Sequence, residues 1–194
     1  RFEVIGAQTE SQPPVAIVPL LDFAHPISLV DHEEATEILR TVCKHYGRTV
    51  AVFGQNRSSN HILAMGLHVR GYTSLLDSDL SADWSVALDS APDFLFISLG
   101  GNLSEAVNPP PDLFSCGVVL APGFRPPDIF DYLQRVTLRE SDEPDTHVPE
   151  SVSRVAQAAG RLQRSPQTLK PVLLVNRSFA RPEFLKAFPR DWYS

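Results

Sequence analysis

The sequence has few of the residues that mark a disulfide-bonded, metal-binding or membrane-spanning protein. Only 2 cysteines, Cys43 and Cys116, occur in 194 residues, and they lie far apart in no metal-ligand spacing. No apolar run approaches the ~20 residues of a membrane-spanning helix, and no signal peptide is visible. We therefore expect a reduced, cytoplasmic chain. We expect no membrane contact from this segment, while the sequence leaves open whether a parent chain has a membrane anchor.

Clustered positive charge is also missing. The chain has 17 Lys+Arg against 23 Asp+Glu, a formal net charge of −6, and no stretch of the sequence concentrates Lys and Arg. Surfaces that bind nucleic acid are usually basic. The sequence therefore predicts that nucleic acid is not a partner.

The common catalytic motifs are absent as well. The turn over residues 54–59 (Gly-Gln-Asn-Arg-Ser-Ser) is neither a Walker loop nor a G-x-G-x-x-G sequence, and no G-x-S-x-G elbow occurs. Cys43 and His45 are two residues apart on a predicted helix, where side chains do not face each other. Residues 22–25 and 32–33 offer carboxylate and imidazole groups, but the histidines have no repeated spacing, which favours surface or capping roles. The sequence predicts no metal and no cofactor.

What is present is a strand, a turn and a helix over residues 49–71. Thr49–Phe53 is a short apolar run rich in β-branched residues, typical of a buried parallel strand. Apolar residues then recur at helical spacing from Ile62 to Val69, and Gly71 is placed to end the helix. A second apolar strand at residues 172–175 is followed by the same Asn-Arg-Ser sequence and another helical pattern over 179–188.

Other elements alternate in the same way. Strands are also predicted at residues 15–21, 72–76, 94–99 and 117–120, and helices at residues 31–46, 81–89, 126–136 and 151–162. Asp31 and Glu34 form a capping box that would begin the helix at Asp31. Strands alternating with helices predict an α/β fold, a doubly wound parallel sheet with helices on both faces.

The predicted organisation has four parts. Residues 1–14 are an entry strand and linker, and residues 15–138 are the α/β domain. Residues 139–170 form an acidic connection and a helix, and residues 171–194 form the start of a further βα unit.

Ligands of such sheets bind at the carboxyl ends of the strands. The residues that follow the predicted strands are Gly54, Gln55, Asn56, Asp77, Asp79, Ser98, Gly100, Ala121 and Pro122. Among these, we single out Asn56, Asp77 and Gly100 as possible ligand-edge residues.

Four short stretches stand at the ends of predicted elements between residues 49 and 138: Phe53-Gly54-Gln55-Asn56, Arg70-Gly71-Tyr72, Pro92-Asp93 and Ala121-Pro122. On these stretches, residues 49–138 resemble the receiver domain of two-component signalling proteins. Phe53-Gly54-Gln55-Asn56 stands where that family ends its first strand in two acidic residues, and Arg70-Gly71-Tyr72 closes the unit. Pro92-Asp93 leads into a strand that ends at Ser98, the position of the phospho-accepting Asp. Ala121-Pro122 stands where the family has Lys-Pro. The resemblance implies a flavodoxin-like sheet, truncated after Ser98, and a place between the kinase core and the true receiver of a hybrid sensor histidine kinase.

The departures from that family remove its chemistry. Gly54, Gln55 and Ser98 offer no carboxylate for Mg²⁺ or for the phosphoryl group, and Ala121 replaces the lysine. The resemblance thus implies a degenerate receiver that regulates through protein partners or neighbouring domains and is not itself an enzyme. Two alternatives stay open. One is a Rossmann-like enzyme domain that binds a nucleotide or sugar, and the other is a structural subunit of a large complex.

Overall fold

The computed structural model describes residues 15–21, 29–80, 84–101, 109–110, 112–123, 147–162, 170–189 and 192. The predicted entry segment 1–14, the residues 22–25, the predicted helix 126–136 and most of the Pro-rich loop lie outside these ranges. Within them, no helix is both long and apolar enough to cross a membrane.

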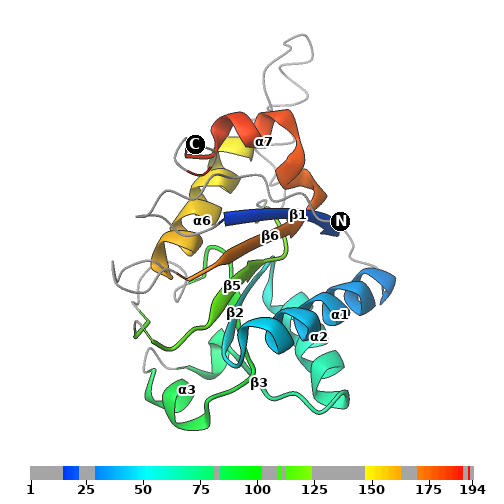
Figure 1. Ribbon diagram of the computed structural model, residues 1–194, viewed down its shortest axis with the longest axis vertical. Coiled ribbons are helices and arrows are strands. Elements are labelled where there is room, and N and C mark those ends of the chain that lie inside the picture. Colours follow the sequence, from blue (N-terminus) through cyan, green and yellow to red (C-terminus); the bar gives the residue numbers. More distant parts are fainter. Residues whose placement is uncertain are drawn as a thin grey trace.

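The described residues form one sheet of six parallel strands in the order β1-β6-β5-β2-β4-β3 (Figure 1). The strands are β1 (Val15–Leu21), β2 (Val50–Gly54), β3 (Ser74–Leu76), β4 (Phe94–Ser98), β5 (Cys116–Val119) and β6 (Val172–Asn176). The predicted parallel α/β sheet is confirmed, and every predicted strand in these ranges is present within two residues of its expected ends. Residues 171–194, predicted as a further βα unit, contribute β6 to this same sheet.

The strand order differs from that of a receiver or flavodoxin, in which the second strand pairs with the first in the order 2-1-3-4-5. Here β3 follows β2 along the chain but pairs with β4, with Ser74 opposite Phe94. The other edge of β4 pairs with β2, with Val50 opposite Phe94. β4 therefore lies between β2 and β3, two consecutive strands that a receiver would place side by side.

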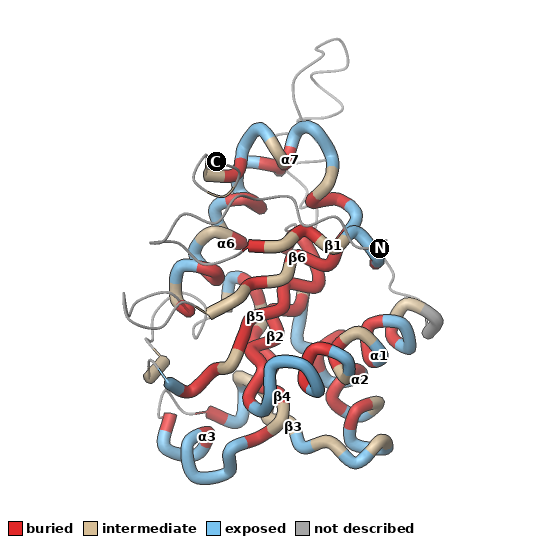
Figure 2. The backbone as a smooth tube through the Cα atoms, in the orientation of Figure 1, coloured by how far each residue is buried: buried red, intermediate tan, exposed pale blue. Residues whose placement is uncertain are grey.

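β2 is an interior strand, as predicted, and all five of its residues are buried. Ala51 and Phe53 face one hydrophobic cluster, while Val50 and Val52 face the other. The apolar run shows no alternation because both faces of the sheet are covered. Figure 2 shows the resulting band of buried backbone through the centre of the fold.

Helices of the described ranges cover both faces of the sheet (Figure 1). The cluster with Val52 includes residues of α1 (Leu29–Tyr46) and α2 (Arg57–Val69). The cluster with Phe53 includes residues of α3 (Ser85–Ser90), α6 (His147–Arg161) and α7 (Pro182–Ala187). Two short 3-10 helices, η1 (Asp77–Asp79) and η2 (Arg177–Ala180), directly follow β3 and β6.

Glycines follow the C-terminal ends of α1 and α2, and α1 begins earlier than the sequence predicts. Gly47 and Gly71, with φ of 94° and 83°, follow α1 and α2, as expected where a chain leaves a helix through the left-handed region. The prediction that Asp31 begins α1 is wrong, because the helix starts at Leu29. Asp31 lies instead within the first turn, where a carboxylate favours the helix dipole.

β1 is an edge strand with a proline at position 19. Proline cannot donate to a strand ladder, so in sheets it is tolerated mainly at edges. β1 pairs with β6 in regular register from Val15 to Ile17. The register shifts between Ile17 and Leu21, the interval that contains Pro19.

Candidate functional site

Because all six strands are parallel, their carboxyl ends meet at one edge of the sheet. This edge is where open α/β sheets bind their ligands. The turns after β2, β3, β4 and β5 bring together Gly54, Gln55, Asn56, Asp77, Asp79, Ser98, Gly100, Ala121 and Pro122. The sequence placed these residues correctly at strand ends, but not their contacts with one another.

Asp77 holds the turn after β4. Its Oδ2 accepts a hydrogen bond from the backbone N–H of Ser98 at 2.8 Å. The N–H of Gly101 donates to the carbonyl oxygen of Ser98 at 3.0 Å, and Gly100 has a φ of 78°. A Cβ on Gly101 would lie 3.0 Å from that same carbonyl oxygen. The turn is therefore tight, and its Asp77 carboxylate is engaged within the protein.

Asn60, in the first turn of α2, is fully buried at this edge. Its Nδ2 is 3.4 Å from the hydroxyl of Ser98, and its Oδ1 has no hydrogen-bond partner in the described structure. A Cβ on Gly54 would lie only 1.7 Å from that Oδ1. Gly54 is thus required by packing, as the residue that leaves room for the Asn60 amide.

Asn56 ends the turn between β2 and α2. Its side chain accepts a hydrogen bond from the N–H of Ser59 at 2.9 Å, which makes Asn56 the N-cap of α2. Asn176 has the same role after β6, where its Oδ1 accepts from the N–H of Ser178 at 2.9 Å. The two Asn-Arg-Ser sequences are therefore matching caps, and each leaves its arginine, Arg57 or Arg177, exposed.

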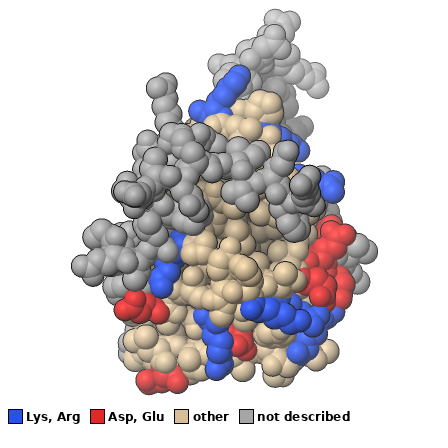
Figure 3. Space-filling view, in the orientation of Figure 1, with Lys and Arg blue, Asp and Glu red and all other residues tan. Residues whose placement is uncertain are grey.

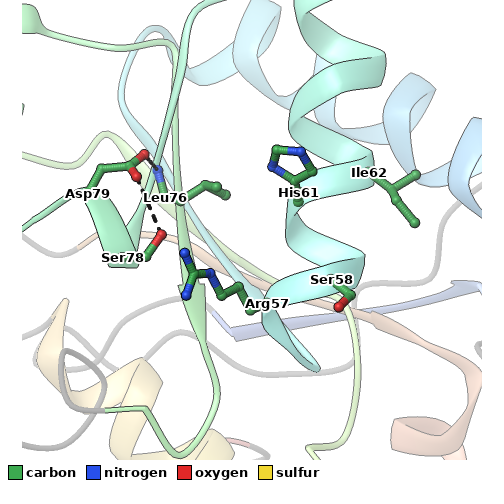
Figure 4. A pocket seen from close by; sticks show the side chains of 7 residues that line it. All are labelled: Arg57, Ser58, His61, Ile62, Leu76, Ser78 and Asp79. Carbon is green, nitrogen blue, oxygen red and sulfur yellow. Dashed lines mark hydrogen bonds between the residues drawn. The ribbon is translucent and has the colours of Figure 1, made fainter.

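A pocket of about 530 Å³ opens between α2 and the β3–η1 segment. It is lined by Arg57, Ser58, His61, Ile62, Leu76, Ser78 and Asp79. Figure 4 shows Arg57 and His61, one helical turn apart, on the side of α2 that faces β3 and η1. Of this set, the residues singled out after the predicted strands include only Asp79, and the turn over residues 54–59 contains Arg57 and Ser58. His61 and Ile62 were not identified as site residues, because the helical pattern marks buried positions and these two lie on the exposed face of α2.

Two side chains of α6 donate hydrogen bonds to the turn after β5. Arg154 donates from Nη1 to the carbonyl oxygen of Gly123 at 2.8 Å and pairs with Glu150 at 2.6 Å. The hydroxyl of Ser151 donates to the carbonyl oxygen of Pro122. The Arg154 guanidinium also lies within 4 Å of the place a Cβ on Gly100 would take. Arg154 therefore lies against the turns after both β4 and β5, and no sequence motif indicates this contact.

The remaining candidates from the sequence are not brought into a site. No group of three His, Cys, Asp or Glu able to hold a metal occurs among the described residues. Burial raises the pKa of the Cys43 thiol, and it raises the pKa of Cys116 to about 12. Both thiols are therefore protonated at neutral pH and unsuited to nucleophilic chemistry.

Charges of both signs adjoin on the face shown in Figure 3. Over α1 and α2, Arg70 contacts Glu33 and lies 3.5 Å from Glu37, which also pairs with Arg40 at 2.6 Å. Arg57 differs from these residues, because it forms no ion pair with any residue in the described ranges.

Comparison with known proteins gives the family. The sequence model named "Helicase C-terminal domain" matches residues 69–194, more than half of the chain. A solved structure titled "XPD_Helicase" superposes with a TM-score of 0.68 at 17% identity, covering 88% of this chain and 33% of that one. The structure of S. tokodaii Xpd4 superposes with a TM-score of 0.66 at 12% identity, covering 90% and 36%. No curated protein matches the chain.

The chain spans about a third of the length of these two structures. At such low identity the two likenesses show the fold, whereas the family model extends over β3, β4, β5, α6 and β6. These findings favour the enzyme-domain alternative over the main interpretation of the sequence.

The receiver resemblance is wrong, and with it the assignment to two-component signalling and the reading of Gly54, Gln55, Ser98 and Ala121 as degenerate receiver positions. The resemblance rested on strand ends that any doubly wound sheet provides. The prediction that nucleic acid is not a partner conflicts with a family defined by helicases, which act on nucleic acid. The chain belongs to the helicase C-terminal domain family.

Proposed function

We propose that this chain is one domain of a nucleic-acid helicase and that it binds a nucleic-acid strand at the carboxyl edge of its sheet. The observation that carries the proposal is the family match over residues 69–194. Nucleic acid is bound chiefly through its phosphates, by Arg and Lys side chains, backbone N–H groups and helix N-termini.

The described edge supplies groups of this kind. Arg57 and Arg177 are exposed after β2 and β6, and neither forms an ion pair with a described residue. Only β5 lies between β2 and β6, so the two strand ends are about 10 Å apart. Two such cations at one edge suit a polyanion better than a compact anion.

Strand separation is driven by nucleotide hydrolysis, and the 194 residues contain no G-x-x-x-x-G-K-[ST] loop to hold a nucleotide's phosphates. We assign that loop to a second domain, with which this one forms the motor. In this arrangement the sheet is RecA-like, as its similarity to helicase structures supports.

The test is direct binding. Fluorescence anisotropy with a labelled single-stranded oligonucleotide should give a saturable, salt-sensitive isotherm, whose log–log slope counts the phosphates contacted. Strand displacement by the parent protein should depend on nucleoside triphosphate. No binding to single-stranded or duplex nucleic acid at low salt, together with no displacement, would refute the proposal.

A further inference from the structure

The pocket between α2 and the β3–η1 segment has the volume and chemistry of a nucleotide site. Its volume of about 530 Å³ falls within the range of small-molecule pockets. We infer that it holds one nucleotide of a single nucleic-acid strand, with Arg57 on the phosphate and His61 against the base. The inference rests on the proposed function and names the place and the contacts.

The cation at this pocket is available for a phosphate. Arg57 is the first residue of α2, where the helix dipole adds positive potential. Two carboxylates lie on the η1 side of the pocket, and Asp79, which lines it, also accepts a hydrogen bond from the Ser78 hydroxyl at 3.3 Å. Asp79 Oδ2 accepts from the N–H of Leu76 at 3.1 Å, and Asp77 Oδ2 accepts from the N–H of Ser98 at 2.8 Å. In Figure 4 the Arg57 side chain extends toward η1 without a hydrogen bond to it.

The rest of the pocket suits a base. His61 follows Arg57 by one helical turn on an exposed part of α2, and Leu76 lies on the opposite wall. Imidazole rings stack on unpaired bases, and aliphatic side chains cover their faces. The Ser58 hydroxyl can both donate and accept hydrogen bonds, and the Ser78 hydroxyl, which donates to Asp79 Oδ1 at 3.3 Å, can still accept one. One wall therefore offers a phosphate contact and a stacking surface about a helical turn apart.

The form of the pocket favours a strand over a free nucleotide. Six of its seven lining residues are exposed, and Leu76 is half-buried. Sites for free small molecules usually bury most of the ligand. An open groove instead lets a polymer enter and leave on either side, with one of its nucleotides held in the pocket.

Matched variants test the inference. Arg57→Ala is compared with Lys44→Ala, which removes an equal charge at the end of α1, outside the pocket. His61→Ala is compared with His68→Ala, an exposed histidine two turns along α2 and outside the pocket. Binding of a labelled oligothymidylate is followed by anisotropy from 50 to 300 mM salt, and circular dichroism verifies that each variant is folded. A parallel titration uses a labelled mononucleotide.

We expect Arg57→Ala to weaken oligonucleotide binding about tenfold and to lower the salt slope by about 0.7, the value for one phosphate contact on a single strand. His61→Ala should weaken binding about fivefold with the slope unchanged, since stacking releases no counterion. Lys44→Ala and His68→Ala should stay within twofold of the wild type. An oligonucleotide carrying 4-thiothymidine should crosslink to peptides within residues 57–80.

The possible failures are distinguishable. If the wild type binds the strand but Arg57→Ala matches Lys44→Ala and crosslinks map elsewhere, the pocket assignment is overturned and the proposed function stands. If Arg57→Ala weakens mononucleotide binding and leaves oligonucleotide binding intact, the pocket is a free-nucleotide site and the inference is overturned. If the wild type binds no strand, the proposed function itself fails.

Discussion

Gly54→Ala should destabilise the protein strongly, because the added methyl group would overlap the side chain of Asn60. The new Cβ would lie 1.7 Å from Oδ1, 2.8 Å from Cγ and 3.3 Å from Nδ2 of Asn60, and these are its three nearest neighbours. Asn60 is fully buried, so its amide cannot simply turn to solvent. Overpacking of this kind costs about 1–3 kcal/mol. The φ of Gly54 is not among the positive values, so backbone strain adds nothing.

A double-mutant cycle isolates the contact. Asn60→Ala removes all three of these atoms, including the Oδ1 that has no hydrogen-bond partner among the described residues, at a cost of about 1–2 kcal/mol. With Ala at position 60, Gly54→Ala should be neutral or stabilising by about 0.4–1 kcal/mol, because it reduces the entropy of the unfolded chain. The coupling energy between the two sites should therefore reach about 2 kcal/mol.

Urea unfolding, followed by both circular dichroism and tryptophan fluorescence, measures each free energy and tests for two-state behaviour. Gly160→Ala is the control, because a Cβ there meets nothing within 4 Å; it should be neutral or stabilising by up to about 1 kcal/mol. If Gly54→Ala costs the same in both backgrounds within about 0.5 kcal/mol, the steric argument is refuted.

Three other outcomes are expected. Burial alone would raise the pKa of Asp93, but hydrogen bonds from Thr73 and Arg48 outweigh it and hold that pKa below its ordinary value of 3.8. Its contribution to stability is present above that value and is lost as pH falls through the lower folded pKa, so Asp93→Asn should flatten the loss of stability below about pH 4. Cys43 and Cys116, both buried with raised pKa values, should resist Ellman's reagent at pH 8 until guanidinium unfolds the protein; rapid reaction of the native protein would contradict their burial. The chain by itself should hydrolyse no nucleoside triphosphate above background, measured by phosphate release with and without oligonucleotide, since it lacks a P-loop sequence.

The strands could be predicted because burial on both faces leaves an unmistakable local pattern. Residues 50–53 and 94–97 are apolar throughout, and the structure buries every one of them. The order in which strands pair leaves no such local trace. Nothing in residues 72–76 indicates that β3 pairs with β4 and not with β2, and on that difference the receiver resemblance failed.

The site was predicted less well, for reasons of geometry and charge. Asn60 lies on the buried face of α2 with Ser59 and Leu63, and its contact with Gly54 exists only when α2 packs over the end of β2. The net charge of −6 suggested that nucleic acid is excluded. A net charge sums over the whole chain, whereas binding depends on which groups remain unpaired. Asp77 and Asp79 accept hydrogen bonds from backbone N–H groups, while Arg57 forms no ion pair with any residue that the structure describes.

The pairing of β1 with β6 also bears on how the protein is made. Val15 lies opposite Val172, so the first described strand pairs only with the last one. At ~5–20 residues per second, a ribosome would synthesise residue 172 roughly 8–30 s after residue 15. During that interval an apolar segment has no strand to join, and unpaired strands of this kind associate with other chains. Pro19 interrupts the ladder that such an association would need, which makes it a safeguard for the nascent chain.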